Sequence, residues 1–259
     1  LGLLDFSEPF EKLLTQGMVL KDGEVMSKSR GNIVDPDGMI KKFGADSLRL
    51  YILFTAPPQD QTEWSQQGLA GAHRFLSRVW RLSEQVKDGV REGGKYAESA
   101  ILLQRKTHQT IKKVTEDIET FKLNTAIASI MELVNEIYRL ADKIPDKEPV
   151  KESIKTAILL LSPFVPHITE EMWARSGNEQ SILKNKWPVY NPELIREETV
   201  AYIIQVNGKV RSKIQVLVDI DEERLRQAVF ADERTKSWIA AKTVKKFIVV
   251  PNKLVNIVV

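Results

Sequence analysis

The residues best suited to phosphate chemistry lie in one short polar loop. Two hydroxyls, two cations and one glycine fall within the six residues that follow Met26, in the run Val25-Met26-Ser27-Lys28-Ser29-Arg30-Gly31-Asn32. Such a loop can wrap a polyphosphate, with Lys28 as a point charge, Ser27 and Ser29 as donors, and backbone N–H groups completing the cradle. A solvated turn is the alternative interpretation, because short motifs of this kind also occur by chance.

The composition argues against other kinds of site. The 259 residues include no Cys, which excludes thiolate chemistry, and only three His, at positions 73, 108 and 167. These histidines are too scattered for a metal site, and we interpret His108 and His167 as structural, so no metal is expected to bind to this chain itself. Four tryptophans are interpreted as packing anchors: Trp80, Trp173, Trp187 and Trp238.

Hydropathy favours a globular, non-membrane protein. Hydrophobic residues make up 42% of the chain and charged residues 28%, which is enough to fill proper cores. No apolar run approaches the roughly 20 residues of a membrane-spanning helix, and no secretory signal is recognised at the start. We therefore expect a cytoplasmic protein that does not associate with membranes.

Short elements must position the loop within residues 1–65. Ser7 and Pro9 can open a helix that carries Phe10, Leu13 and Leu14 and ends at Gly17. Residues 18–26 predict a tight hairpin around Asp22-Gly23. After the loop, Asp35-Pro36 is typical of a helix start and Gly44 of its end. Residues 46–55, apolar on nearly all sides, predict a buried helix.

The next 130 residues, 66–195, predict a helical bundle. Apolar residues recur at three-to-four spacing in four long segments and one short one, which is the period of helices packed on a common core. The segments lie near residues 69–86, 101–118, 126–141, 154–161 and 168–173. A glycine-containing loop is expected over residues 88–99 and a linker over 145–149.

From Val200 the period changes to two, which predicts a small α+β domain over residues 196–259. Asn207-Gly208-Lys209 separates two strands, and a three-residue loop with a glycine bulge would pair Val206 with Val210 and Ile204 with Ser212. A helix capped by Asp219 or Asp221 follows, and two closing strands flank Pro251-Asn252. The predicted fold is thus multidomain and mainly α: a short α/β segment carrying the loop, the bundle, and this small domain.

The loop and its surroundings resemble the class I aminoacyl-tRNA synthetases. The run from Val25 to Asn32 is similar to their KMSKS signature, and the closest match is the leucyl-tRNA synthetase family. Residues that carry the resemblance extend along nearly the whole chain: Glu8-Pro9-Phe10, residues 13–19, residues 44–49, Ala56-Pro57-Pro58, Glu63-Trp64-Ser65, residues 74–82 and Gln205–Arg211. The last of these resembles a C-terminal tRNA-binding domain, and the bundle resembles an anticodon-binding domain.

The resemblance implies ATP-dependent attachment of leucine to tRNA(Leu). In the family the loop closes over the triphosphate, so ATP with Mg²⁺ is the expected nucleotide, bound by Met26, Ser27, Lys28, Ser29 and Arg30. Lys28 occupies the place of the second motif lysine and is the candidate catalytic residue, since a cation aimed at the departing pyrophosphate acts on the transition state. Val25 stands where the family usually has the first lysine, and Arg30 is expected to cover part of that loss.

Other parts of the family's enzymes are missing from the sequence. We find no His-x-Gly-His motif, no long Rossmann half and no editing domain. The resemblance therefore implies the smaller, C-terminal partner of a split synthetase, inactive without an N-terminal catalytic (alpha) chain. A non-catalytic tRNA-binding or scaffold protein with a vestigial loop is the alternative. A valine or isoleucine enzyme fragment is a third interpretation, and the run Val206–Arg211 argues against it.

Basic residues are the candidate contacts with tRNA. Residues 196–259 hold 12 basic and 8 acidic groups, an excess that suits a polyanionic partner. On the predicted face opposite the apolar one, Arg211 and Lys213 alternate. The candidates in this domain are Lys209, Arg211, Lys213, Lys245 and Lys246. In the bundle, Arg74, Arg78 and Arg81 recur as one helical stripe that could hold phosphates or could equally be salt-bridged.

Overall fold

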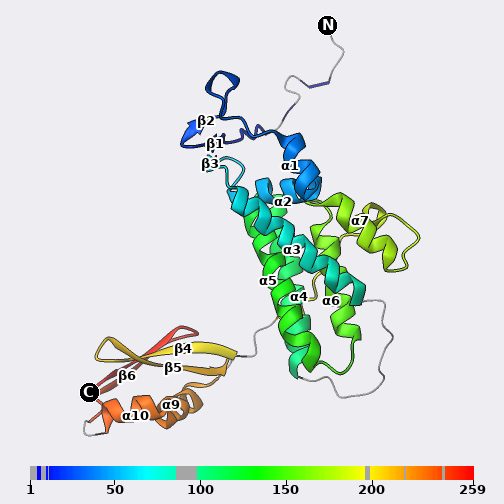
Figure 1. Cartoon of the computed structure of the whole chain (residues 1–259). Helices are drawn as coiled ribbons and strands as arrows, with labels where there is room; N and C mark the ends of the chain where they lie inside the picture. The colour runs from blue at the N-terminus through cyan, green and yellow to red at the C-terminus, as the bar shows by residue number, and fades with distance from the viewer. Residues whose placement is uncertain are drawn as a thin grey trace. The chain divides into compact units, whose positions relative to one another are not determined.

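The computed structural model describes residues 5, 6, 10, 12–85, 98–195, 199–218, 220–240 and 243–259. The chain divides into two compact units, Leu1–Ile195 and Arg196–Val259, and each is described by itself. Helices dominate the first unit and a sheet with two helices forms the second (Figure 1). None of the helices in the described ranges is long and apolar enough to cross a membrane.

A three-stranded sheet carries the polar loop. Strand β1 (Val19–Lys21) pairs antiparallel with β2 (Glu24–Val25) and parallel with β3 (Thr62–Glu63), in the order β2-β1-β3. Asp22 and Gly23 form the turn with φ of 58° and 75°, the left-handed values of a two-residue type I′ hairpin. The predicted hairpin is confirmed.

The helix predicted before this hairpin is wrong over its described residues. Residues 10 and 12–17 have no regular structure, and residues 7–9 and 11 lie outside the described part of the chain. Gly17 ends no helix. Its N–H donates to the Pro58 carbonyl at 2.8 Å, and a Cβ at this position would lie 2.0 Å from the Asp60 carbonyl oxygen. Gly17 is therefore needed because two backbone segments approach each other closely.

Two helices follow the loop. The N-terminus of α1 (Pro36–Phe43) is capped by the Asp35 carboxylate, which accepts the N–H groups of Asp37 and Gly38 at 3.1 Å, as the sequence predicts. Helix α2 (Ala45–Thr55) is buried only on one side, whereas Ile52 and Phe54 are 40% and 39% exposed. The predicted helix over residues 46–55 is confirmed, but it is only partly buried, because α2 packs at the edge of the bundle.

Four long helices and a shorter one make up the bundle. They are α3 (Gln66–Gln85), α4 (Glu98–Glu119), α5 (Leu123–Leu140), α6 (Glu148–Leu161) and α7 (Pro166–Arg175). Their buried side chains form one core that also includes Leu50 and Tyr51 of α2, so the loop segment and the bundle pack together. Helix α2 lies at the same end of the bundle as α7 (Figure 1). The loop predicted over residues 88–99 falls mostly outside the described residues.

Short helical turns connect these elements. They are η1 (Lys28–Arg30), η2 (Ala141–Lys143), η3 (Ile182–Lys184) and α8 (Pro192–Ile195). The segment before α8 lies along α4: the Trp187 indole N–H donates to Thr115 Oγ1 at 2.8 Å, and the Asn191 N–H donates to His108 Nδ1 at 3.1 Å. Burial lowers the pKa of His108, and the charge of Glu152 partly opposes this shift, so burial favours the neutral ring that can accept this hydrogen bond.

The second unit is a four-stranded sheet with two helices. Strands β4 (Thr199–Val206), β5 (Lys209–Leu217), β6 (Lys246–Val250) and β7 (Leu254–Val258) lie in the order β5-β4-β7-β6, and β4 is parallel to β7. Helices α9 (Glu222–Ala231) and α10 (Glu233–Ile239) follow β5, and Asp221 caps α9. The core is formed by Tyr202, Ile204, Val206, Val216, Leu225, Val229, Val255 and Ile257. The predicted strands and first helix are confirmed, and α10 is an addition to them.

The turn between β4 and β5 differs from the prediction. Asn207 and Gly208, with φ of 51° and 75°, form a two-residue turn that pairs Val206 with Lys209. The register then shifts beside Ile204, which pairs with Ser212 as predicted, so Arg211 is the extra residue of a bulge. The three-residue loop is therefore wrong, because the Asn-Gly pair favours the tighter turn and the bulge restores the apolar face.

The bulge also changes the surroundings of Arg211. Its guanidinium lies 3.5 Å from the ring centroid of Trp238, which is on α10, and not beside Lys213 on the opposite face. The predicted alternation of these two cations is wrong for that reason. Trp238, which the sequence predicts as a packing anchor, is 42% exposed, and the Arg211 guanidinium packs on its ring.

Candidate functional site

The polar loop is a single 3-10 turn that begins after Ser27. The Arg30 N–H donates to the Ser27 carbonyl at 3.2 Å, and the Gly31 N–H donates to the Lys28 carbonyl at 3.3 Å. Gly31, with φ of 65°, then takes the chain out of the turn. Two backbone hydrogen bonds therefore define the turn itself.

Asn32 fastens the loop to the hairpin beneath it. Its Oδ1 accepts the Ser27 N–H at 2.8 Å, and its Nδ2 donates to the carbonyls of Lys21 and Val25 at 3.4 and 3.3 Å. One amide therefore closes both ends of the loop. From the sequence alone, Asn32 has no predicted role of its own. The feature that could have indicated this role is an amide side chain directly after the loop glycine, Gly31.

The side chains of the loop differ in how much they are engaged. Lys28 is exposed, and within the described ranges no hydrogen bond or ion pair engages its ammonium. The Ser27 and Ser29 hydroxyls lie 3.1 Å apart. Arg30 donates to the Glu24 carboxylate at 2.7 Å, with both side chains more than half exposed, so this pair is weak and separable. Met26 is half-buried at the base of the loop.

Aromatic contacts join the loop's sheet to the bundle. The backbone N–H of Trp64 donates to the Leu20 carbonyl at 2.7 Å. The Trp64 ring meets the Tyr51 ring of α2 edge-on, with the ring centroids 5.1 Å apart. The Tyr51 hydroxyl in turn accepts the Ser65 N–H at 2.6 Å. The position of the loop is therefore set by a chain of contacts that begins in the helical core.

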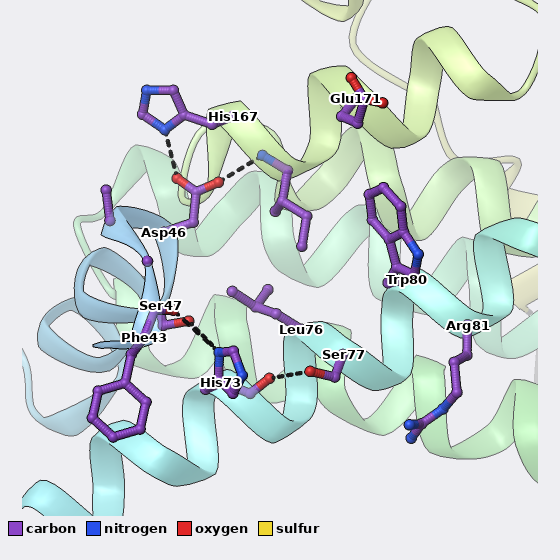
Figure 2. A pocket seen from close by; sticks show the side chains of 13 residues that line it. Phe43, Asp46, Ser47, His73, Leu76, Ser77, Trp80, Arg81, His167 and Glu171 are labelled. Atoms are coloured by element: carbon purple, nitrogen blue, oxygen red, sulfur yellow. Dashed lines mark hydrogen bonds and ion pairs between the residues drawn. The ribbon is translucent and has the colours of Figure 1, made fainter. Parts of the chain in front are cut away.

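A second junction lies at the start of α2, where a cavity of about 780 Å³ opens between α2, α3 and α7 (Figure 2). The buried Asp46 carboxylate accepts the Ile168 N–H at 2.6 Å and contacts His167 Nδ1 at 2.9 Å, so it caps α7. Ser47 Oγ lies 3.2 Å from His73 Nδ1 on α3. His167 thus has the structural role that the sequence predicts.

The three arginines of α3 do not form one open stripe. Arg74 and Arg81 are exposed, and Arg81 lines the cavity of Figure 2 together with Trp80. Arg78 donates to Asn135 Oδ1 at 2.8 Å and lies 4.9 Å from the Tyr138 ring centroid. Arg78 therefore joins α3 to α5, whereas Arg74 and Arg81 remain accessible.

The basic residues of the second unit are mostly accessible. Lys209, Lys213, Lys245 and Lys246 are exposed, whereas Arg211 is half-buried. Lys213 lies opposite Ile203 on the side of the sheet that faces away from the core. In neither unit do the described residues bring together three or more His, Asp or Glu side chains that could hold a metal ion.

Comparisons with known proteins identify relatives for the whole chain. Residues 3–65 match the family "tRNA synthetases class I (I, L, M and V)", and residues 102–225 match "Anticodon-binding domain of tRNA ligase". Leucine–tRNA ligases of Syntrophobacter fumaroxidans and Thermotoga maritima are 49% and 47% identical over 100% of this chain, which spans 33% of each relative.

A solved structure gives the same result. The LeuRS of Agrobacterium radiobacter K84 agnB2, in a ternary complex with tRNA and LeuAMS, matches 99% of this chain and 34% of its own, at 33% identity and a TM-score of 0.82. The chain thus spans about a third of the length of its relatives. These likenesses show that the chain belongs to the class I aminoacyl-tRNA synthetases and corresponds to the C-terminal portion of leucine–tRNA ligases.

Proposed function

We propose that this chain supplies the ATP-phosphate loop and the tRNA-binding surfaces of a leucine–tRNA ligase that attaches leucine to tRNA(Leu). It needs the N-terminal catalytic part of such a ligase for activity, because it corresponds to only about a third of the length of its relatives. The observation that carries the proposal is the likeness to leucine–tRNA ligases along the entire chain. The exposure of Lys28 supports the role of the loop.

The chemistry requires a cation where Lys28 could supply one. In leucine activation a carboxylate oxygen attacks the α-phosphorus of ATP, the new P–O bond forms, and the bond to the leaving pyrophosphate breaks. Negative charge grows on the pyrophosphate as that bond breaks. Lys28 would stabilise this charge, with the Ser27 and Ser29 hydroxyls as donors to phosphate oxygens. Mg²⁺ would arrive with ATP.

Arg30 would bind the triphosphate only after it leaves its ion pair with Glu24. Its ion pair with Glu24 is exposed and weak, so a bound triphosphate could draw the guanidinium away from the carboxylate. Arg30 would then provide the second cation of a loop in which Val25 stands at the place of the first lysine.

The test is leucine-dependent ATP–pyrophosphate exchange, with this chain alone and with the N-terminal catalytic chain added. We expect exchange only in the mixture. Lys28→Ala should lower kcat by about 10²–10³-fold, the usual effect of removing one preorganised donor. The matched control is Lys41→Ala on α1, another exposed lysine, which should leave exchange unchanged.

The alternative is a non-catalytic tRNA-binding or scaffold protein with a vestigial loop, and Val25 is the residue that favours it. A mixture that forms a complex by size-exclusion chromatography yet shows no exchange would support this alternative. So would full exchange by Lys28→Ala.

A further inference from the structure

One dipeptide of the chain is of the type most prone to spontaneous deamidation. Asn207-Gly208 is the only place in the 259 residues where glycine directly follows asparagine. In such a pair the backbone nitrogen of the glycine can attack the side-chain carbonyl carbon of the asparagine, because glycine has no side chain to hinder the approach. Both residues are exposed in the turn between β4 and β5, where water has access.

The reaction replaces the side-chain amide by an acid. A bond forms between the Gly208 nitrogen and Asn207 Cγ, and the bond between Cγ and Nδ2 breaks. The proton of the Gly208 nitrogen leaves with the NH₂ group as ammonia. Water then opens the resulting five-membered imide, and residue 207 becomes aspartate or isoaspartate according to which carbonyl the water attacks. Water is the one reactant that must be added.

Hydrogen bonds engage both reacting groups of this dipeptide. The Gly208 N–H, whose proton must be lost, donates to Asn256 Oδ1 at 3.0 Å. The Asn207 side-chain carbonyl accepts the Val259 N–H at 3.1 Å. The Asn207 N–H donates to the Ile257 carbonyl at 2.9 Å, so the turn is fastened to the end of β7, the parallel neighbour of β4. The nitrogen and the carbonyl are thus held by different residues.

We propose that Asn256 protects Asn207-Gly208 against deamidation by holding the proton of the attacking nitrogen, while Val259 fixes the orientation of the amide under attack. Removing that proton first requires the hydrogen bond to Asn256 to break, which costs free energy. Both protecting groups belong to β7 and the residue after it. The protection therefore comes from the pairing of β7 with β4 and not from the sequence of the β4–β5 hairpin.

Deamidation at this position would damage the hairpin. The two-residue turn pairs Val206 with Lys209, and isoaspartate places one extra backbone atom between the two residues of the turn. A tight turn whose geometry matches the twist of its strands cannot absorb that atom without disturbing the pairing. Either product also adds a negative charge to a unit that holds 12 basic and 8 acidic groups.

The experiment incubates the full chain at mildly alkaline pH and follows the replacement of NH₂ by OH at residue 207 by peptide mass spectrometry. We expect the native chain to react about ten- to hundredfold more slowly than the same chain unfolded in guanidinium chloride, the effect of two hydrogen bonds. Asn256→Ala should accelerate the reaction of the native chain about three- to tenfold. Asn256→Asp, which keeps an acceptor for the Gly208 N–H, should not accelerate it.

The matched control is Ile248→Ala. Ile248 pairs with Asn256 across the strands, so its truncation weakens the sheet without removing the acceptor. Circular dichroism and the melting temperature establish that each variant is folded. A wild-type rate in the folded Asn256→Ala variant would overturn the inference, and so would equal rates in the native and unfolded wild-type chain. Equal acceleration by Ile248→Ala would also overturn it, because the rate would then follow the stability of the sheet.

Discussion

Asp46 is a single side chain that fixes two helices in place. It lies near the start of α2, is 7% exposed, and holds the first turn of α7 through the Ile168 N–H and His167. A neighbouring residue, Arg49, donates to the carbonyls of Phe164 and Pro163 at 3.0 and 3.4 Å, just before α7. The run from Gly44 to Arg49, which resembles a family segment in sequence, is therefore a joint between helices.

At this scale we predict that Asp46→Ala lowers the free energy of unfolding by about 1–3 kcal/mol. The change removes a helix cap and leaves the Ile168 N–H without its acceptor. Urea denaturation followed by circular dichroism measures the effect. Asp37→Ala, at an exposed carboxylate on α1, is the control and should stay within about 0.5 kcal/mol of wild type. An equal effect of the two changes would contradict the capping role.

The small sheet that carries the loop depends on a close approach between the backbone at Gly17 and the backbone of residues 58–61. Gly17 lies against residues 58–61, and the same region continues into β3, which pairs with β1. The hairpin that carries Lys28 is thus held by a segment that lies far from it in sequence. Closing such a junction requires a residue without a side chain at position 17.

We therefore predict that Gly17→Ala loosens this sheet while Gly71→Ala does not. A Cβ at position 17 would collide with backbone, whereas a Cβ at position 71 would meet its nearest neighbour, a side-chain nitrogen of Arg74, at 3.8 Å within α3. Hydrogen exchange of the Trp64 amide, which bonds to Leu20, should accelerate in the first variant only. Gly71→Ala should stabilise the chain by about 0.5–1 kcal/mol, the helix-interior gain over glycine. Unchanged exchange in Gly17→Ala would show that the junction can relax.

On the scale of the molecule, the second unit has a core of its own. Buried apolar residues from the sheet and α9 form it, and they are separate from the core of the bundle. We predict that residues 196–259 fold alone with a cooperative thermal transition. Leu225→Ala should cost about 2–5 kcal/mol, enough to abolish the fold of so small a domain. Circular dichroism of the isolated segment checks this, and a featureless melting curve for the wild-type segment would contradict it.

Local sequence was sufficient for elements whose conformation depends on adjacent residues. Asp22-Gly23 determines its hairpin because both residues tolerate left-handed backbone, and Asp35-Pro36 determines a helix start for reasons of capping and fixed φ. Helical and strand periods likewise predicted the bundle and the small α+β domain. The loop from Met26 to Arg30 was also recognisable, since its chemistry lies in consecutive residues.

The surroundings of individual side chains required the tertiary structure. Arg74, Arg78 and Arg81 follow one another at helical spacing, so the sequence does not distinguish them. In the structure only Arg78 of the three contacts Asn135 and Tyr138 on α5. Arg211 is the extra residue of a bulge. The bulge follows the tight turn at Asn207-Gly208 and compensates for the register that this turn imposes. Sequence determined the conformations that neighbouring residues impose on one another. Tertiary structure decided which cations remain accessible and which apolar faces remain open, because these depend on contacts between residues far apart in the chain.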